Sequence, residues 1–231
     1  VKLVFKSCAI NIDRIILKTF VEGINFLNTN KNNKNFTIIT FENKRINISL
    51  FKNRSYVLTQ DFNFGVELII KDISKLCSLK MNDVEIFLKE INLRVVLEND
   101  IESCLDKKFF SNSPYRKIRH QLILDIITAR LDEFIEKCYE KNINLNYLKK
   151  NNNTVYITIE NCEFFKNIQL GLKENKLINP EFIFGKNLEE TYLLNLNGAA
   201  ELIGKGWEKE AIPVVQPKKS LISIFFSSLF S

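Results

Sequence analysis

The sequence predicts an α/β domain in which helices cover a sheet, and three observations carry this prediction. Residues 36–41 form a largely apolar run, and Ile46, Ile48 and Leu50 alternate with polar residues, as buried and half-buried strands do. A continuous apolar stripe over about 115–141 is typical of a long helix packed on a core. Strands and helices are mixed along the chain, which favours a sheet covered by helices.

The elements before and around the first strand follow from the same patterns. A short helix is predicted over 2–9, an apolar strand over 12–17 and a second helix over 19–27, which leads into an Asn/Lys-rich loop. After the alternating strand, residues 56–62 are predicted as a third strand of the hairpin series. The helix that follows carries its apolar side chains on one face, namely Leu68, Ile69, Ile73 and Leu76.

The second half of the chain is predicted to be mostly helical. Asn82 and Glu85 have the spacing of a capping box at a helix start, and 93–97 is predicted as a strand. The long helix is expected to begin just after Pro114, where a helix start tolerates proline. An Asn-rich loop at 142–153 then precedes a strand at 155–159 and helices at about 163–175 and 190–205.

Composition excludes several classes of function. No segment approaches the roughly 20 apolar residues that cross a bilayer, and the start lacks a signal-peptide pattern, so the protein is expected in the cytosol. The 5 cysteines lack C-x-x-C spacing and are expected to be reduced thiols. His120 is the single histidine, which argues against a histidine-based metal cluster and a Ser/His/Asp triad, and we expect no catalytic residue and no metal.

The last residues read as an amphipathic helix that lies on a membrane. A Pro-containing linker at 207–219 precedes it, and serines would share one stripe of the helix. Such a short helix is marginal in water and needs a surface on which to fold. The chain's own core and a partner groove remain alternative surfaces. The predicted membrane-binding residues are Lys218, Lys219, Leu221, Ile222, Ile224, Phe225, Phe226, Leu229 and Phe230.

The order of these elements resembles the C-terminal half of the FtsA family, the actin-like proteins that tether the FtsZ ring to the bacterial membrane. Segments 4–27, 36–51, 56–65 and 114–137 resemble successive elements of that family. The resemblance covers essentially the whole chain but only about half of a family member, and it rests on order and spacing because no motif is intact. It implies an actin-like (ribonuclease H-like) core at 1–76 and 154–206, an inserted α/β subdomain at 77–153, the linker, and a membrane helix at 220–231.

The resemblance also identifies two eroded nucleotide loops. The family's glycine-rich phosphate loop falls on Thr40, Glu42, Asn43, Lys44, Arg45 and Asn47, and its adenosine loop falls on Ile159, Glu160 and Asn161. Every glycine of both loops is replaced, and glycine is what permits close backbone approach to a phosphate. We therefore expect no ATP, no Mg²⁺ and no ATPase activity. Weak phosphate attraction by Lys44 and Arg45 stays open, as does an ATP-binding protein with unusual loops.

The partners implied by the resemblance are the FtsZ C-terminal tail, an anionic membrane surface at the inner face of the cytoplasmic membrane, and further copies in an actin-like filament. Arg119, His120 and Arg130 fall where the family binds the FtsZ tail, although such a charge run is also typical of a solvated helix face. The net charge of +6 permits nucleic-acid binding as a rival function. We predict no nucleic acid as a partner, because no recognised nucleic-acid motif is present and the phenylalanines have core spacing.

Overall fold

The computed structural model describes residues 2–12, 15–29, 34–99, 102–145, 154–160, 163–174, 181–182 and 188–206. Its first part contains helices α1 (Lys2–Ser7) and α2 (Lys18–Thr29) and strands β1 (Phe36–Phe41), β2 (Ile46–Lys52) and β3 (Ser55–Phe62). Helices α3 (Glu67–Cys77), α4 (Met81–Glu90), α5 (Leu93–Asn99) and α6 (His120–Ile135) follow. The chain then returns to the sheet with β4 (Thr154–Ile159), α7 (Phe165–Glu174), β5 (Glu181–Phe182) and α8 (Leu188–Lys205).

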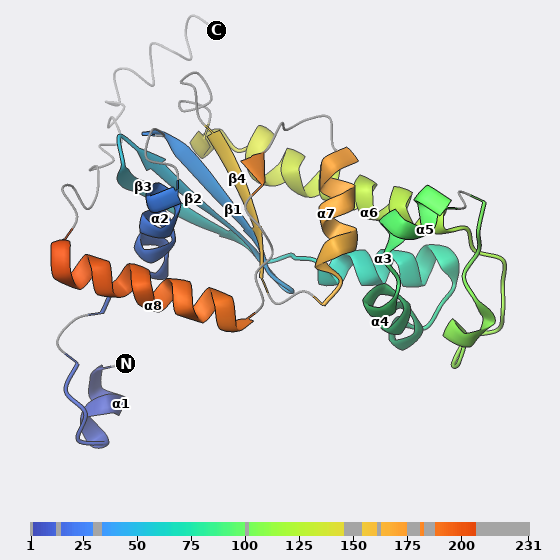
Figure 1. Cartoon of the computed structure of the whole chain (residues 1–231), viewed down its shortest axis with the longest axis horizontal. Helices are drawn as coiled ribbons and strands as arrows, with labels where there is room; N and C mark the ends of the chain where they lie inside the picture. Colours follow the sequence, from blue (N-terminus) through green and yellow to red (C-terminus); the bar gives the residue numbers. More distant parts are fainter. Residues whose placement is uncertain are drawn as a thin grey trace, which may run out of the picture.

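The sheet has five strands in the order β3-β2-β1-β4-β5 (Figure 1). Strand β1 pairs antiparallel with β2 and parallel with β4, so it lies at the centre. Phe36 and Ile38 belong to one apolar cluster, together with Phe26 of α2, while Ile39 and Phe41 belong to another. Because both faces of β1 are covered, all six of its residues are buried, including Thr37 and Thr40.

One large core extends from the sheet into the helical part of the chain. Ile39 and Ile48 of the sheet belong to the same buried cluster as three phenylalanines of the helical part. These are Phe87 of α4, Phe109 of the segment between α5 and α6, and Phe134 of α6. Helices α3 to α6 extend from the sheet toward one end of the molecule (Figure 1). Helices α2 and α8 pack against each other at the other end, on the face of the sheet that carries Phe36 and Ile38. The helical part is therefore held by a core that it shares with the sheet.

A buried carboxylate fixes the loop that precedes α6. Asp83, in the first turn of α4, accepts hydrogen bonds from the Asn112 backbone N–H (3.2 Å), the Asn112 side-chain amide (2.9 Å) and the Ser113 hydroxyl (2.6 Å). Burial raises the pKa of Asp83, but these hydrogen bonds outweigh it and the pKa is lowered. The predicted cap residue Asn82 lies inside the first turn, and Lys80 is the N-cap, so that prediction was wrong.

Two predicted strands are absent from the described residues. Segment 93–97 is helical, as part of α5, because the buried Asn167 side chain accepts a hydrogen bond from the Leu93 N–H (3.0 Å) and caps the helix start. In the predicted strand 12–17, the described residues form no strand; Ile15 and Leu17 are 59% and 56% exposed. With no neighbouring strand to pair with, an apolar run does not form a sheet there.

The long helix begins later than predicted. Its N-cap is Arg119, which has an extended backbone and forms a bridge with Cys104. Two backbone hydrogen bonds accompany this bridge, from Leu105 N–H to the Ile118 carbonyl (2.9 Å) and from His120 N–H to the Ser103 carbonyl (3.1 Å). The residues after Pro114 therefore pair with an earlier segment instead of forming the first helical turns. At its other end, α6 continues as a π-helical turn over Glu136–Glu140.

Candidate functional site

The candidate site lies where the two central parallel strands end. Phe41 of β1 is paired with Ile159 of β4, and the Glu160 N–H donates to the Phe41 carbonyl (2.8 Å). In open α/β sheets, ligands bind just outside the carboxyl ends of such strands. Here those positions are taken by Glu42 and Glu160, so the segments at which the two nucleotide loops were expected meet at one point and bring two carboxylates to it.

The turn after β1 is bonded to the start of α3. The Glu42 N–H donates to the Arg45 carbonyl (2.9 Å), which closes the turn. The Val66 N–H then donates to the Glu42 carbonyl (3.1 Å), and the Glu67 N–H donates to the Asn43 carbonyl (2.9 Å). Free N–H groups at a helix start are what normally bind a phosphate. At α3 these two donors are already used by the protein's own turn.

Gly65 allows this close contact between the turn and α3. A Cβ at this position would lie 2.3 Å from the Glu42 carbonyl oxygen, 2.6 Å from the Arg45 nitrogen and 2.7 Å from the Asn43 carbonyl oxygen. All three atoms belong to the backbone, so they have little freedom to move away. Glycine at this position thus serves the packing of the turn on α3, because any side chain there would collide with the turn's backbone.

Charged side chains at the strand ends neutralise one another. Lys18, at the start of α2, lies 2.7 Å from a Glu160 oxygen, 3.4 Å from a Glu22 oxygen and 4.0 Å from a Glu42 oxygen. Arg45 Nε lies 2.5 Å from the other Glu42 oxygen. We call these five residues the strand-end cluster. It holds three carboxylates against two cations, so it offers no excess of positive charge to a phosphate.

Burial shifts the titration of this cluster. It raises the pKa of Glu22 to about 7, with Lys18 opposing the shift and Glu160 and Glu42 adding to it. Burial lowers the pKa of Lys18, but the hydrogen bond to Glu160 and the attraction of the carboxylates outweigh it, so the pKa is raised. Near neutral pH the cluster therefore exchanges a proton at Glu22 while Lys18 keeps its charge.

The remaining residues of the predicted nucleotide loops have structural partners or lie at the surface. The Thr158 hydroxyl donates to the buried Thr40 hydroxyl (2.8 Å). Asn47 donates to Asp61 (2.9 Å) and accepts from Ser49 (2.8 Å). Lys44 is exposed and Ile159 is buried. Asn161 lies outside the described residues.

The three predicted partner-binding residues engage different neighbours. Arg119 is exposed and lies 3.6 Å from Glu102, while His120 is buried, with Nδ1 2.9 Å from both the hydroxyl and the carbonyl oxygen of Ser103. Arg130 forms ion pairs with Asp72 of α3 and with Glu133. Arg130 lies ten residues along α6 from His120, about 15 Å at 1.5 Å per residue, so the three do not form one compact patch.

Sequence reasoning missed three residues of the site, namely Lys18, Glu22 and Gly65. The Lys18–Glu22 spacing is that of a helical ion pair, but nothing in it indicates that Glu42 and Glu160 share the lysine. The predicted membrane residues Lys218, Lys219 and 221–230 lie outside the described part of the chain. Within the described residues, no helix is long and apolar enough to span a bilayer, and no His/Cys/Asp/Glu group has a metal-binding arrangement.

Comparison with known proteins identifies the fold. No protein-family model and no curated protein matches the sequence. Among solved structures, MreB5 of Spiroplasma citri bound to ADP is similar with a TM-score of 0.56 and 12% identity, over 87% of this chain and 63% of that chain. Bacillus thuringiensis ParM with ADP has a TM-score of 0.46 and 14% identity, over 74% and 48% of the two chains. EutJ of Carboxydothermus hydrogenoformans has a TM-score of 0.46 and 11% identity, over 85% and 57%.

The chain spans less than two thirds of the MreB5 and EutJ chains that it matches. At 12% identity the likeness to MreB5 bears on the fold alone. The resemblance read from the sequence is therefore confirmed at the level of the fold: this is an α/β chain with the actin-like ATPase fold.

Proposed function

We propose that this protein is a non-catalytic actin-like adaptor that tethers the FtsZ ring to the inner face of the cytoplasmic membrane at the division site. The observation that carries the proposal is the strand-end cluster. The place where an α/β fold binds its ligand is filled by the protein's own carboxylates and bonded turn. A fold that keeps its scaffold and fills this place suits a role in binding other proteins.

Electrostatics supports the absence of a nucleotide. A phosphate charge about 4 Å from a carboxylate is repelled by roughly 4 kcal/mol at an effective dielectric constant of 20. Lys18 and Arg45 offset only part of this repulsion, because both already face carboxylates. The α3 donors Val66 and Glu67 are also engaged, so binding would first have to break their hydrogen bonds to the turn.

Isothermal titration with Mg-ATP and Mg-ADP tests the nucleotide part of the proposal. We expect no binding heat at micromolar concentrations of the full chain, with an actin-like ATPase of known affinity as the positive control. Micromolar affinity would overturn the proposal and favour an actin-like ATP-binding protein with unusual loops.

Liposome co-sedimentation tests the tether. The full chain is compared with a chain ending at Pro217 and with a Phe225→Glu/Phe226→Glu variant, on vesicles with and without anionic lipid. We expect binding of the full chain alone, because the apolar face and Lys218–Lys219 would supply the membrane affinity. Equal sedimentation of the full and shortened chains would remove the anchor from the proposal.

A further inference from the structure

The segment between α5 and α6 forms a loop whose two ends are paired with each other. Cys104 forms a bridge with Arg119, and the Leu105 N–H donates to the Ile118 carbonyl (2.9 Å). Residues 104–119 therefore leave and rejoin the helical part at one place, as a compact surface loop does. This loop lies beyond α4 and α5, at the end of the molecule farthest from α8 (Figure 1).

Positive charge is concentrated in this loop. Its 16 residues hold five cations and one carboxylate, so they carry +4 of the chain's net charge of +6. All five cationic residues are exposed, namely Lys107, Lys108, Arg116, Lys117 and Arg119. We call residues 104–119 the basic loop. A local excess of this size attracts anionic surfaces and ligands.

Neighbouring residues neutralise little of this charge. Lys108 lies 3.7 Å from Glu90, Arg119 lies 3.6 Å from Glu102, and all four side chains are more than half exposed. Such exposed ion pairs contribute little and are screened by salt. The other three cations make no ion pair and no side-chain hydrogen bond within the described part of the chain: Lys107, Arg116 and Lys117.

An aromatic contact brings the two cationic stretches of the loop together. The Lys107 ammonium lies 5.3 Å from the centre of the Tyr115 ring, and that ring packs edge-on against Phe110, with 5.1 Å between centroids. Phe110 is buried, whereas Tyr115 is 45% exposed. Lys107 on one limb of the loop therefore adjoins the other limb, where Arg116 and Lys117 follow the tyrosine. Cations beside a half-exposed amphipathic ring suit a surface that meets lipid headgroups.

Two buried anchors hold the basic loop in shape. The Asp83 carboxylate of α4 accepts hydrogen bonds from Asn112 and Ser113, which lie midway along the loop. Phe109 is buried against Phe87 of α4, with ring centroids 6.3 Å apart. Because the loop is fixed on α4 at both places, it presents its cations without first having to become ordered, and this lowers the cost of binding.

We infer that the basic loop binds the headgroups of an anionic membrane, as a second contact beside the C-terminal tail. Lipid is the occupant that the geometry favours, because a flat anionic surface can meet a protruding loop without a groove. The inference rests on the proposed function for the membrane itself and adds an orientation to it. The tail continues from α8, at the opposite end of the molecule, so the two contacts would lay the long axis along the membrane (Figure 1). Arg119 is thereby assigned to lipid rather than to the FtsZ tail.

Co-sedimentation of the full chain with vesicles tests the inference. Each cation near an anionic surface contributes up to about fivefold in affinity. Lys107→Gln/Arg116→Gln/Lys117→Gln should therefore weaken binding to phosphatidylcholine vesicles with about 30% phosphatidylglycerol by about tenfold or more. The difference from wild type should disappear on pure phosphatidylcholine and at about 0.5 M salt, where the charges are screened.

A matched control separates the loop from net charge. Lys34→Gln/Lys166→Gln/Lys173→Gln removes the same charge from three exposed lysines outside the loop and should bind almost as wild type does. Equal losses for the two triple variants would mean that net charge alone drives binding and would overturn the inference. Circular dichroism melts confirm that each variant is folded before binding is compared.

Quenching of tryptophan fluorescence by brominated lipids tests where the loop lies. The single tryptophan, Trp207, is replaced by Phe in both proteins that are compared. Tyr115→Trp should be quenched on anionic vesicles, because the loop touches the headgroups. Ile143→Trp is the control, since Ile143 is 81% exposed and follows the far end of α6, and it should not be quenched. Absence of quenching at position 115 in sedimented protein would overturn the inference.

The outcomes separate the basic loop from the proposed function. If the loop variant binds anionic vesicles as wild type does, or loses only an FtsZ tail peptide, the inference is overturned and the tether by the tail stands. If Phe225→Glu/Phe226→Glu binds as wild type does while the loop variant loses binding, the tail leaves the proposal and the loop remains. If wild type binds neither kind of vesicle, both are overturned.

Discussion

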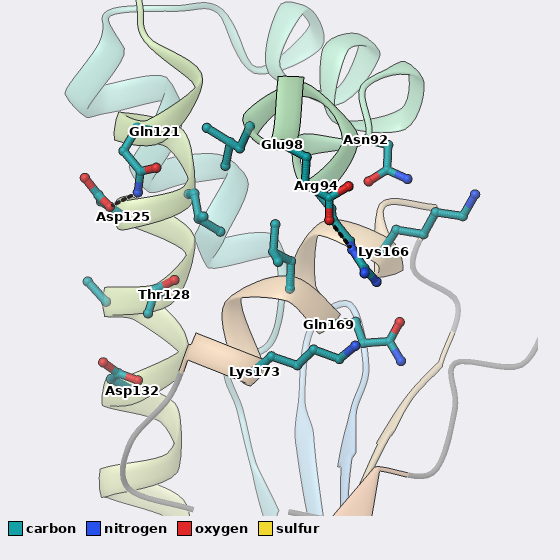
Figure 2. A pocket seen from close by; sticks show the side chains of 14 residues that line it. Asn92, Arg94, Glu98, Gln121, Asp125, Thr128, Asp132, Lys166, Gln169 and Lys173 are labelled. Carbon is teal, nitrogen blue, oxygen red and sulfur yellow. Dashed lines mark hydrogen bonds and ion pairs between the residues drawn. The ribbon is translucent and has the colours of Figure 1, made fainter. Parts of the chain in front are cut away.

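The strand-end cluster and the groove of about 960 Å³ between α5, α6 and α7 (Figure 2) differ in how their charged side chains are paired. At the strand ends, Lys18 and Arg45 form ion pairs with the carboxylates of the cluster. The turn after β1 accepts hydrogen bonds from the first amides of α3. In the groove, Lys166 and Lys173 are exposed above leucines. The first surface pairs its cations with its own carboxylates, whereas the second leaves Lys166 and Lys173 without an ion pair to a described residue.

Gly65→Ala should have the largest effect, because it forces the turn away from α3. A Cβ 2.3 Å from a backbone oxygen cannot be accommodated without moving the chain, and we expect about 3 kcal/mol of destabilisation in urea unfolding. Gly204→Ala in α8 is the control, since a Cβ there meets nothing within 4 Å and alanine favours a helix by about 1 kcal/mol. A neutral Gly65→Ala would mean that the turn is not fixed on α3.

Charge reversal should separate the two surfaces directly. Lys18→Glu would gather four carboxylates at the strand ends, and we expect about 2 kcal/mol of destabilisation. Lys166→Glu/Lys173→Glu should change the free energy of unfolding by less than about 0.5 kcal/mol, because no described residue depends on those lysines. Thermal or urea unfolding at fixed ionic strength measures both. Equal changes in the free energy of unfolding would contradict the difference between the paired lysine at the strand ends and the unpaired lysines of the groove.

The pH dependence of stability gives a smaller but specific signal. Burial raises the pKa of Glu22 to about 7, above its value in the unfolded chain, so the folded state binds the extra proton. Stability from this group is complete at low pH and is lost as pH rises toward 7. Glu22→Gln should remove that loss, making the variant more stable than wild type by about 2 kcal/mol at pH 8 relative to pH 5. Parallel stability curves for the two proteins would contradict the raised pKa.

The spacing of apolar residues along the chain correctly predicted much of the fold. The strands at 36–41 and 56–62, the helix after them and the strand at 155–159 all lie where apolar spacing indicates. The misses came from long-range contacts. Residues 93–97 are rich in strand-forming side chains, yet Asn167, more than seventy positions away, caps them as a helix. The start of α6 is delayed by pairing between Arg119 and Cys104, which no local pattern reveals.

Only part of the candidate site could be predicted from the sequence. Once the resemblance placed the two expected nucleotide loops on 40–47 and 159–161, the sequence showed that they contain no glycine and that they carry Glu42 and Glu160. The role of Lys18 could not be read from the sequence, because two of its three partners, Glu42 and Glu160, come from distant places in the chain. The groove was missed for the same reason, since α5, α6 and α7 supply one wall each and none carries a recognisable motif alone.

The hydrogen bonds between α3 and the turn bear on what it would take to open a phosphate site at the strand ends. Glycines placed at positions 42–45 would clear side chains, yet the Val66 and Glu67 amides would still be bonded to the turn's carbonyls. Freeing them requires an 11-residue helix and its buried Ile69 and Ile73 to shift within the shared core. Opening a phosphate site at this place would thus need a shift of α3 in addition to glycines in the turn.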